Sequence, residues 1–235
     1  MFDKHPKGLI AAALANLGER FGFYTMMAIL VLFLQAKFGM NGKEAGFIYS
    51  TFYFSIYILA LVGGIIADKT RNYKGTIFTG IVLMAVGYLL LAIPSKTPVD
   101  NKMLYLVITC ASLFVIAFGN GLFKGNLQAL VGQMYDNPQY ANMRDSGFSL
   151  FYMFINIGAI FAPFAAVGVR NWWLSTFGYN YDADLPALCH GQLAGTLSPE
   201  ATETYHTLVT KASTAPVQDY TAFASDYLNV FTTGF

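Results

Sequence analysis

Two oppositely charged side chains stand side by side in an otherwise apolar stretch near the start of the sequence. Glu19 and Arg20 lie about midway along the run from Gly8 to Leu34. About 20 helical residues cross the ~30 Å hydrocarbon core of a membrane, so this run predicts a membrane span. Each charge at that depth costs on the order of 3 kcal/mol, and such residues commonly serve a function. The alternative interpretation is a structural ion pair that faces neighbouring helices.

Helical spacing gives this pair polar neighbours. Asn16, Arg20 and Tyr24 follow at intervals of four residues and therefore share one helix face, with Glu19 beside them. Lys124 is a further charge within an apolar run. It either extends to the membrane surface or faces a cavity. In a cavity, two cations would share the one anion and would suit a ligand that carries a carboxylate.

Polar residues also mark a later span and one connection. Asn156 offers amide donors and an acceptor, either to a ligand or to a structural hydrogen bond between helices. The turn at residues 63–75 combines glycines with Asp68, Arg71 and Lys74. It is either an ordinary turn or a charged gate between two helices.

The composition is that of a membrane protein. Hydrophobic residues make up 55% of the 235 residues and charged residues only 11%, whereas soluble domains carry about 25% charged residues. The net charge of +1 gives no indication of nucleic-acid binding, and no nucleic-acid partner is expected. Residues 1–170 hold 13 basic and 7 acidic residues, and residues 171–235 hold 1 and 6. The chain is therefore expected to divide into a membrane part and a polar part.

Five apolar runs predict five membrane-spanning helices of an all-α bundle. The connections between them are short, so consecutive helices are expected to be antiparallel neighbours. With the two flanking ends, they form a predicted membrane domain over residues 1–173. The predicted spans cover residues 8–34, 45–67, 76–93, 104–131 and 147–169.

Glycines recur within these runs. Small residues let membrane helices approach closely, so the glycines are interpreted as packing positions. The residues concerned are Gly18, Gly22, Gly63, Gly64, Gly119, Gly121 and Gly125.

The polar segment at residues 174–235 predicts a small helical hairpin. Ser198 followed by Pro199 is typical of a helix start, with a capping hydroxyl and a proline in the first turn. Apolar residues then recur at helical spacing. The two amphipathic helices are predicted at residues 199–213 and 217–231.

Cysteine and histidine are scarce. Cys110 lies in an apolar run and Cys189 in the polar segment, so a disulfide between them is not expected. Cys189 and His190 have no third partner in sequence and are interpreted as ordinary surface residues. No metal site and no cofactor are predicted. The spans hold no nucleophile–base pair, so the sequence does not predict an enzyme.

In combination, these motifs resemble the proton-coupled oligopeptide transporter family of the major facilitator superfamily. The resemblance covers residues 1 to about 170 and rests on residues 16–24, the glycine-rich segment around Lys124, and residues 151–158. It implies a major facilitator-type bundle of which this chain holds the first five helices. The second, six-helix half would be missing. The turn at residues 63–75 is similar to the family's gating loop between helices two and three.

The resemblance also implies roles for the polar residues. A proton-coupling charge network would consist of Glu19, Arg20 and Lys124. Substrate contacts would come from Arg20, Tyr24, Tyr57, Lys124 and Asn156. The gating loop would act through Asp68, Arg71 and Lys74.

Three positions depart from the family pattern. Asn16 stands where the family has the first glutamate of its first-helix motif. Phe23 replaces a tyrosine. Met27 occupies a position at which peptide-binding members often have a cavity arginine.

The implied function is import of di- and tripeptides by proton symport through alternating access. The partners would be the peptide, protons and the lipid bilayer of a plasma or inner membrane. The N-terminus would be cytoplasmic, and residues 174–235 would form an extracytoplasmic insertion between helices five and six. Counts of basic residues on the two sides tie, and only the cluster Lys69, Arg71 and Lys74 favours this orientation.

Two alternatives remain open at this point. The same fold could carry another small anionic or zwitterionic solute, with altered or absent proton coupling; the departure at Met27 motivates this reading. The chain could also belong to a scaffold that transports nothing.

Overall fold

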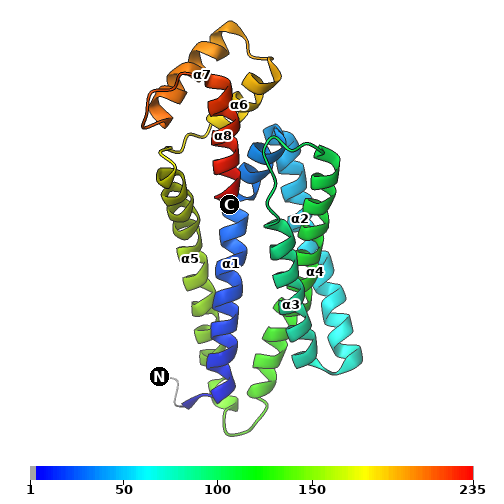
Figure 1. Cartoon of the computed structure of the whole chain (residues 1–235). Helices are drawn as coiled ribbons and strands as arrows, with labels where there is room; N and C mark the ends of the chain where they lie inside the picture. Colours follow the sequence, from blue (N-terminus) through cyan, green and yellow to red (C-terminus); the bar gives the residue numbers. More distant parts are fainter. Residues whose placement is uncertain (1–3, 235) are drawn as a thin grey trace. The chain divides into compact units, whose positions relative to one another are not determined.

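The computed structural model describes residues 4–234, which form eight α-helices (Figure 1). Five of these are long and apolar enough to cross a membrane, so the protein is an integral membrane protein. An α-helix satisfies all its backbone hydrogen bonds within the segment, which is what a membrane span requires. The five helices are α1 (Lys7–Phe38), α2 (Gly42–Thr70), α3 (Tyr73–Leu91), α4 (Lys102–Met134) and α5 (Arg144–Thr176).

The helix bounds differ from the predicted spans at several ends. Backbone hydrogen bonding continues past the apolar stretches, so that α5 reaches Thr176 rather than ending at residue 169. The exception is α3, which ends at Leu91, before the predicted end at residue 93. The proline at position 94 disfavours helical backbone at the residue before it, which contributes to this stop.

Packing divides the chain into two compact units. The first unit holds the described residues up to Met26, together with Ser50–Leu91 and Ile108–Pro163. The second unit holds Met27–Tyr49, Ala92–Val107 and the described residues from Phe164 onward. The helices α1, α2, α4 and α5 contribute residues to both units. The predicted boundary between the membrane domain (residues 1–173) and the polar segment (residues 174–235) is a different one, because it marks where the chain would leave the membrane. It stays a prediction.

In the first unit, α4 packs closely on its neighbours at glycines. A Cβ atom added at Gly119 would lie 2.6 Å from the carbonyl oxygen of Gly80 on α3. One at Gly121 would lie 2.5 Å from the carbonyl oxygen of Leu59 on α2. Only glycine permits such contact between backbones, so the packing interpretation is confirmed here and at Gly63, which faces Gly121. At Gly18, Gly22, Gly64 and Gly125 an added Cβ would meet nothing within 4 Å among residues 4–234, so their packing role stays a prediction.

The second unit contains three short helices, α6 (Leu185–Ala194), α7 (Pro199–Ala212) and α8 (Tyr220–Thr233). The predicted start at Ser198 is confirmed, because its side chain accepts a hydrogen bond from the Ala201 amide at 3.2 Å. The last helix begins at Tyr220 rather than residue 217, since Asp219 caps it. Both predicted helices are therefore present as α7 and α8, and α6 is an additional helix that was not predicted from the sequence.

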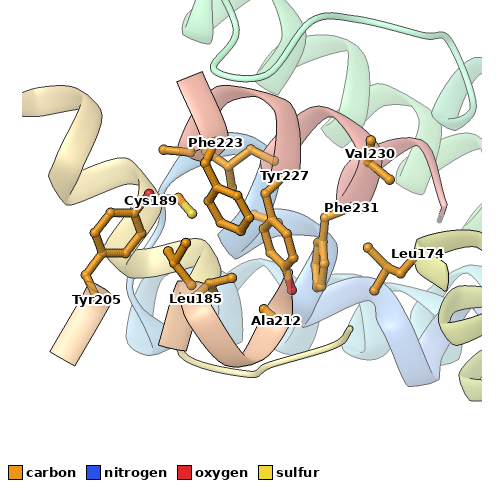
Figure 2. Packing of buried hydrophobic residues seen from close by; sticks show 13 residues of the cluster. Leu174, Leu185, Cys189, Tyr205, Ala212, Phe223, Tyr227, Val230 and Phe231 are labelled. Carbon is orange, nitrogen blue, oxygen red and sulfur yellow. The ribbon is translucent and has the colours of Figure 1, made fainter. Parts of the chain in front are cut away.

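An aromatic stack forms the centre of these helices (Figure 2). The ring of Tyr227 stacks between those of Phe223 and Phe231, with centroids 5.6 and 5.7 Å away. Cys189 from α6 is fully buried against this core. Burial raises the pKa of its thiol to about 12.

Hydrogen bonds between residues far apart in the sequence hold segments of the second unit together. The Nε2 atom of His190 lies 2.7 Å from the carbonyl oxygen of Ala36 near the end of α1. The Asn229 side chain on α8 accepts a hydrogen bond of 2.5 Å from the backbone amide of Thr97. The indole of Trp173 on α5 donates to the Val230 carbonyl at 3.0 Å. The surface interpretation of Cys189 and His190 is therefore wrong.

Candidate functional site

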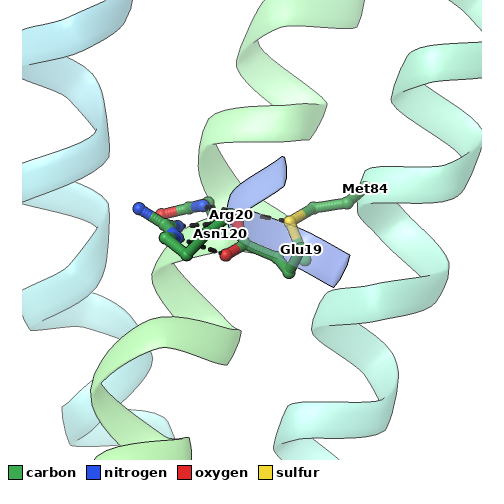
Figure 3. A network of polar contacts seen from close by, with 4 residues as sticks. All are labelled: Glu19, Arg20, Met84 and Asn120. Carbon is green, nitrogen blue, oxygen red and sulfur yellow. Dashed lines mark hydrogen bonds and ion pairs between the residues drawn. The ribbon is translucent and has the colours of Figure 1, made fainter. Parts of the chain in front are cut away.

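Glu19 and Arg20 form a buried ion pair on α1 (Figure 3). The guanidinium Nε and terminal nitrogen donate to the two carboxylate oxygens at 2.5 and 2.6 Å. The Arg20 side chain is only 5% exposed and the Glu19 side chain 7%. Two parallel charge-assisted bonds are the strongest geometry available to this pair, and inside an apolar helix they offset part of the cost of desolvation.

A third residue joins the pair from another helix. The Nδ2 atom of Asn120 on α4 donates to Glu19 Oε1 at 2.6 Å, and Figure 3 shows the two side chains meeting. The same nitrogen lies 4.0 Å from the sulfur of Met84 on α3. Asn120 is fully buried, and its Oδ1 atom has no hydrogen-bond partner among the described residues. Asn120 was not predicted from the sequence, although an amide between Gly119 and Gly121 in an apolar run indicates a buried polar group.

The predicted polar face of α1 is present around this pair. Asn16 is buried at 5% exposure. The Arg20 guanidinium carbon lies 4.9 Å from the ring centre of Phe23 and 5.8 Å from that of Tyr24. These distances are in the range of cation–π attraction. Met27, farther along α1 in the second unit, is half-buried.

Lys124 lies near the ion pair and not on a separate surface of the first unit. Its Nζ atom is 5.5 Å from the ring centre of Tyr57 on α2. The hydroxyl of Tyr57 is in turn 3.0 Å from that of Tyr53. Lys124 also interacts electrostatically with Arg20 and Glu19. The structure therefore gathers two cations around one carboxylate, lined by tyrosines.

Asn156 is not among the residues that surround the Glu19 carboxylate. Its side chain is exposed on α5, and no hydrogen bond to it is found among residues 4–234. Two residues farther along, Gly158 brings α5 against α1, because an added Cβ would lie 2.8 Å from the Leu17 carbonyl oxygen. The role predicted for Asn156 stays a prediction.

The loop residues Asp68, Arg71 and Lys74 are all exposed. Asp68 accepts a hydrogen bond of 2.6 Å from the hydroxyl of Tyr73 at the start of α3. Within the described part of the chain, no ion pair joins Asp68 to a basic residue of this loop. Arg71 adopts a left-handed conformation with φ of 50°, which turns the chain between α2 and α3. The gating role stays a prediction.

The arrangement can bind charged groups. In residues 4–234, no group of three or more His, Cys, Asp and Glu side chains that could hold a metal ion is found. A carboxylate held by a guanidinium and an amide in an apolar environment can take up a proton and lose its attraction for the cation. The freed cation is then available to an anionic ligand.

Comparison with known proteins gives consistent results. A family model described as PTR2, POT family, matches residues 74–189. The peptide transporter YePEPT of Yersinia enterocolitica is 34% identical over 185 residues, which cover 77% of this chain and 34% of the relative. The dipeptide and tripeptide permease A of an Enterobacter species is 34% identical over 179 residues, which cover 75% of this chain and 32% of the relative.

A solved structure is also similar. It is a crystal structure of a mutant of the peptide transporter POT in complex with sulfate, with a TM-score of 0.63 and 28% sequence identity. The match covers 90% of this chain and 45% of that one. The chain thus spans about a third of the length of the curated relatives it matches. With its five apolar helices and its major facilitator-type fold, the chain belongs to the POT family of transporters.

Proposed function

We propose that the complete protein imports di- and tripeptides by proton symport through alternating access. The observation that carries this proposal is the buried Glu19–Arg20 pair, joined to α4 through Asn120. The printed names of two relatives, a peptide transporter and a dipeptide and tripeptide permease, support a peptide as the substrate. Transport sites of this kind lie between two halves that rock about them. This chain would supply helices of one half, and a further six-helix half would supply the other.

The charge network would couple proton uptake to substrate binding. An ionised Glu19 holds Arg20 and attracts Lys124. Protonation removes this attraction, because the Coulomb energy depends on the carboxylate charge. The two cations would then be free to bind the carboxylate end of a peptide. The proposed contacts with the substrate are Arg20, Tyr24, Tyr57, Lys124 and Asn156.

The placement in the membrane follows from the same proposal. The protein would lie in a plasma or inner membrane with its N-terminus in the cytoplasm. Asp68, Arg71 and Lys74 would then gate the cytoplasmic side of the helices. Residues 174–235 would form an extracytoplasmic insertion between helices five and six.

Uptake in liposomes tests this function. The complete protein is reconstituted, and accumulation of a labelled dipeptide is measured with an inward proton gradient. Glu19→Gln is expected to abolish gradient-driven uptake, because the amide cannot bind the coupling proton. Exchange of dipeptide across the membrane without a gradient is expected to persist, since that reaction needs no net proton movement.

Glu203→Gln is the matched control, because it makes the same change at an exposed position of α7. It is expected to transport like the unmodified protein. Equal loss of uptake and exchange in Glu19→Gln would contradict the coupling role and leave a role in binding or folding. Failure of unlabelled di- and tripeptides to compete would instead indicate a different small solute.

A further inference from the structure

All hydrogen bonds that the structure gives to the Glu19 carboxyl group come from N–H donors. Two come from Arg20 and one from Asn120. Such an arrangement suits the ionised carboxylate, which only accepts hydrogen bonds. A protonated carboxyl group also carries an O–H donor, and neither arginine nor lysine has an acceptor for it. Proton uptake therefore needs an acceptor that the ion pair itself lacks.

Asn120 carries a suitable acceptor that is unused. Its Oδ1 atom is buried and has no hydrogen-bond partner among the described residues, while Nδ2 lies 2.6 Å from Glu19 Oε1. Buried polar atoms without partners are rare and require an explanation. Rotation of the amide by half a turn exchanges Oδ1 and Nδ2 without changing the shape of the side chain. The same residue can thus donate to the carboxylate and accept from the carboxylic acid.

Other charged or titratable groups interact with Glu19 from α1, α3 and α4. Arg20 lies beside it on α1, and Lys124 interacts with it electrostatically from α4. Tyr88 interacts with it electrostatically from α3, and the Tyr88 hydroxyl is also buried without a partner among residues 4–234. The two cations have no acceptor, so Tyr88 is the alternative that an experiment must separate from Asn120.

We propose that Asn120 is a positioning residue for protonation of Glu19 and keeps α1 bound to α4 in both protonation states. The proton forms an O–H bond on a carboxylate oxygen, and the group changes from an anion to a neutral acid. The Asn120 amide rotates to accept that O–H. Arg20 loses its anionic partner and becomes available to the substrate. This inference rests on the proposed function, because it assigns a residue to its coupling step.

The test compares two variants of the complete protein in liposomes. Asn120→Leu keeps the shape of the side chain but has neither donor nor acceptor. Asn120→Thr keeps both in one hydroxyl. The pH midpoint of gradient-driven dipeptide uptake is expected to move to higher pH in Asn120→Leu, by about one unit or tenfold in proton concentration. The reason is that the lost bond to the carboxylate is roughly twice as strong as the lost bond to the neutral acid. Asn120→Thr is expected to stay close to the unmodified protein.

Infrared difference spectra give a second readout, which would not change if Asn120 had only a structural role. The C=O band of the protonated carboxyl group is assigned by its loss in Glu19→Gln. It is expected at higher wavenumber in Asn120→Leu, because the acid has lost its hydrogen-bond acceptor. If Asn120→Leu does not fold, Asn120→Ser and Asn120→Ala make the same comparison with smaller side chains.

The outcomes separate the inference from the proposed function. An unmodified protein without proton-driven dipeptide uptake would overturn the proposed function. Normal uptake together with an unchanged pH profile and an unchanged band in Asn120→Leu would overturn the inference alone. A shift in Tyr88→Phe without one in Asn120→Leu would assign the acceptor to Tyr88 and would also overturn it.

Discussion

Single side chains set the charge inside the first unit. Glu19 faces two cations, Arg20 and Lys124, so the three ionised groups together carry one net positive charge. Asn16 is buried on the same helix face and adds no charge. A glutamate at that position would balance the two cations. The surplus charge favours a ligand with a free carboxylate, which agrees with the proposed peptide substrate.

A single imidazole connects α6 to the end of α1. His190 is half-buried, and its Nε2–H donates to the Ala36 carbonyl. Burial lowers the pKa of His190; the hydrogen bond to Ala36 raises it, and Lys102 nearby lowers it. The net shift is downward, so the folded protein binds the proton less readily than the unfolded chain. Stability from this residue is therefore present at neutral pH and is lost as the pH falls below about 6.5.

We expect the amides of α6 to exchange faster with deuterium at pH 5.5 than at pH 7.5, after correction for the intrinsic rates. Protonation places a charge on a half-buried ring close to Lys102. His190→Gln should remove this difference, because glutamine keeps an N–H donor for Ala36 and does not titrate. A pH difference of the same size in the glutamine variant would exclude His190 as its cause. Mass spectrometry of peptides covering Leu185–Ala194 provides the measurement.

At the scale of helices, glycine positions on α4 differ sharply in what they contact. Gly119 lies against the backbone of α3, whereas Gly125 on the same helix has open space around it. Helix association in a membrane depends on such close packing, since lipid provides no hydrophobic drive between helices. The two glycines therefore form a matched pair for testing helix packing.

Gly119→Ala is expected to destabilise the protein by about 1–3 kcal/mol, because the new methyl group overlaps Gly80 and Met84. Gly125→Ala is expected to be neutral or to stabilise by up to about 1 kcal/mol, since alanine favours helix over glycine. The apparent midpoint of thermal unfolding in one detergent compares the two. Equal midpoints would show that α3 and α4 separate enough to accept the methyl group.

At the scale of the whole molecule, the orientation in the membrane determines which segments between and after the spans lie outside the cell. Five spans with a cytoplasmic start place the α4–α5 connection in the cytoplasm and the helices α6 to α8 outside. Gln139 and Glu203 are exposed residues of these two parts. The buried Cys189 does not interfere with labelling, because its thiol is inaccessible and its pKa is raised to about 12.

Variants with one added cysteine in a Cys110→Ala background, which keeps the buried Cys189, test this orientation. Glu203→Cys is expected to react with a membrane-impermeant maleimide in intact cells. Gln139→Cys is expected to react only after the cells are permeabilised. The reverse pattern would show that the N-terminus faces the outside. Gel-shift labelling of the two variants measures this directly.

Several features of this protein could be predicted from the sequence because their causes are local. The bilayer imposes a length on each apolar run, so five spans were predicted and five candidate spans are found. The cap at Ser198 depends only on residues within one helical turn. Glu19 and Arg20 are adjacent in sequence, so their pairing needed no tertiary information. The family resemblance rests on the same local motifs.

Other features depended on contacts between residues far apart in the sequence. Asn120 is 101 positions from Glu19, and His190 is 154 positions from Ala36. Spacing along one helix tells which residues share a face but not which residue of another helix meets that face. For the same reason, the sequence could not distinguish the glycines in tight contact from those in open space. Tertiary packing alone selected Asn120 as the third partner of Glu19 and buried Cys189, which had been expected on the surface.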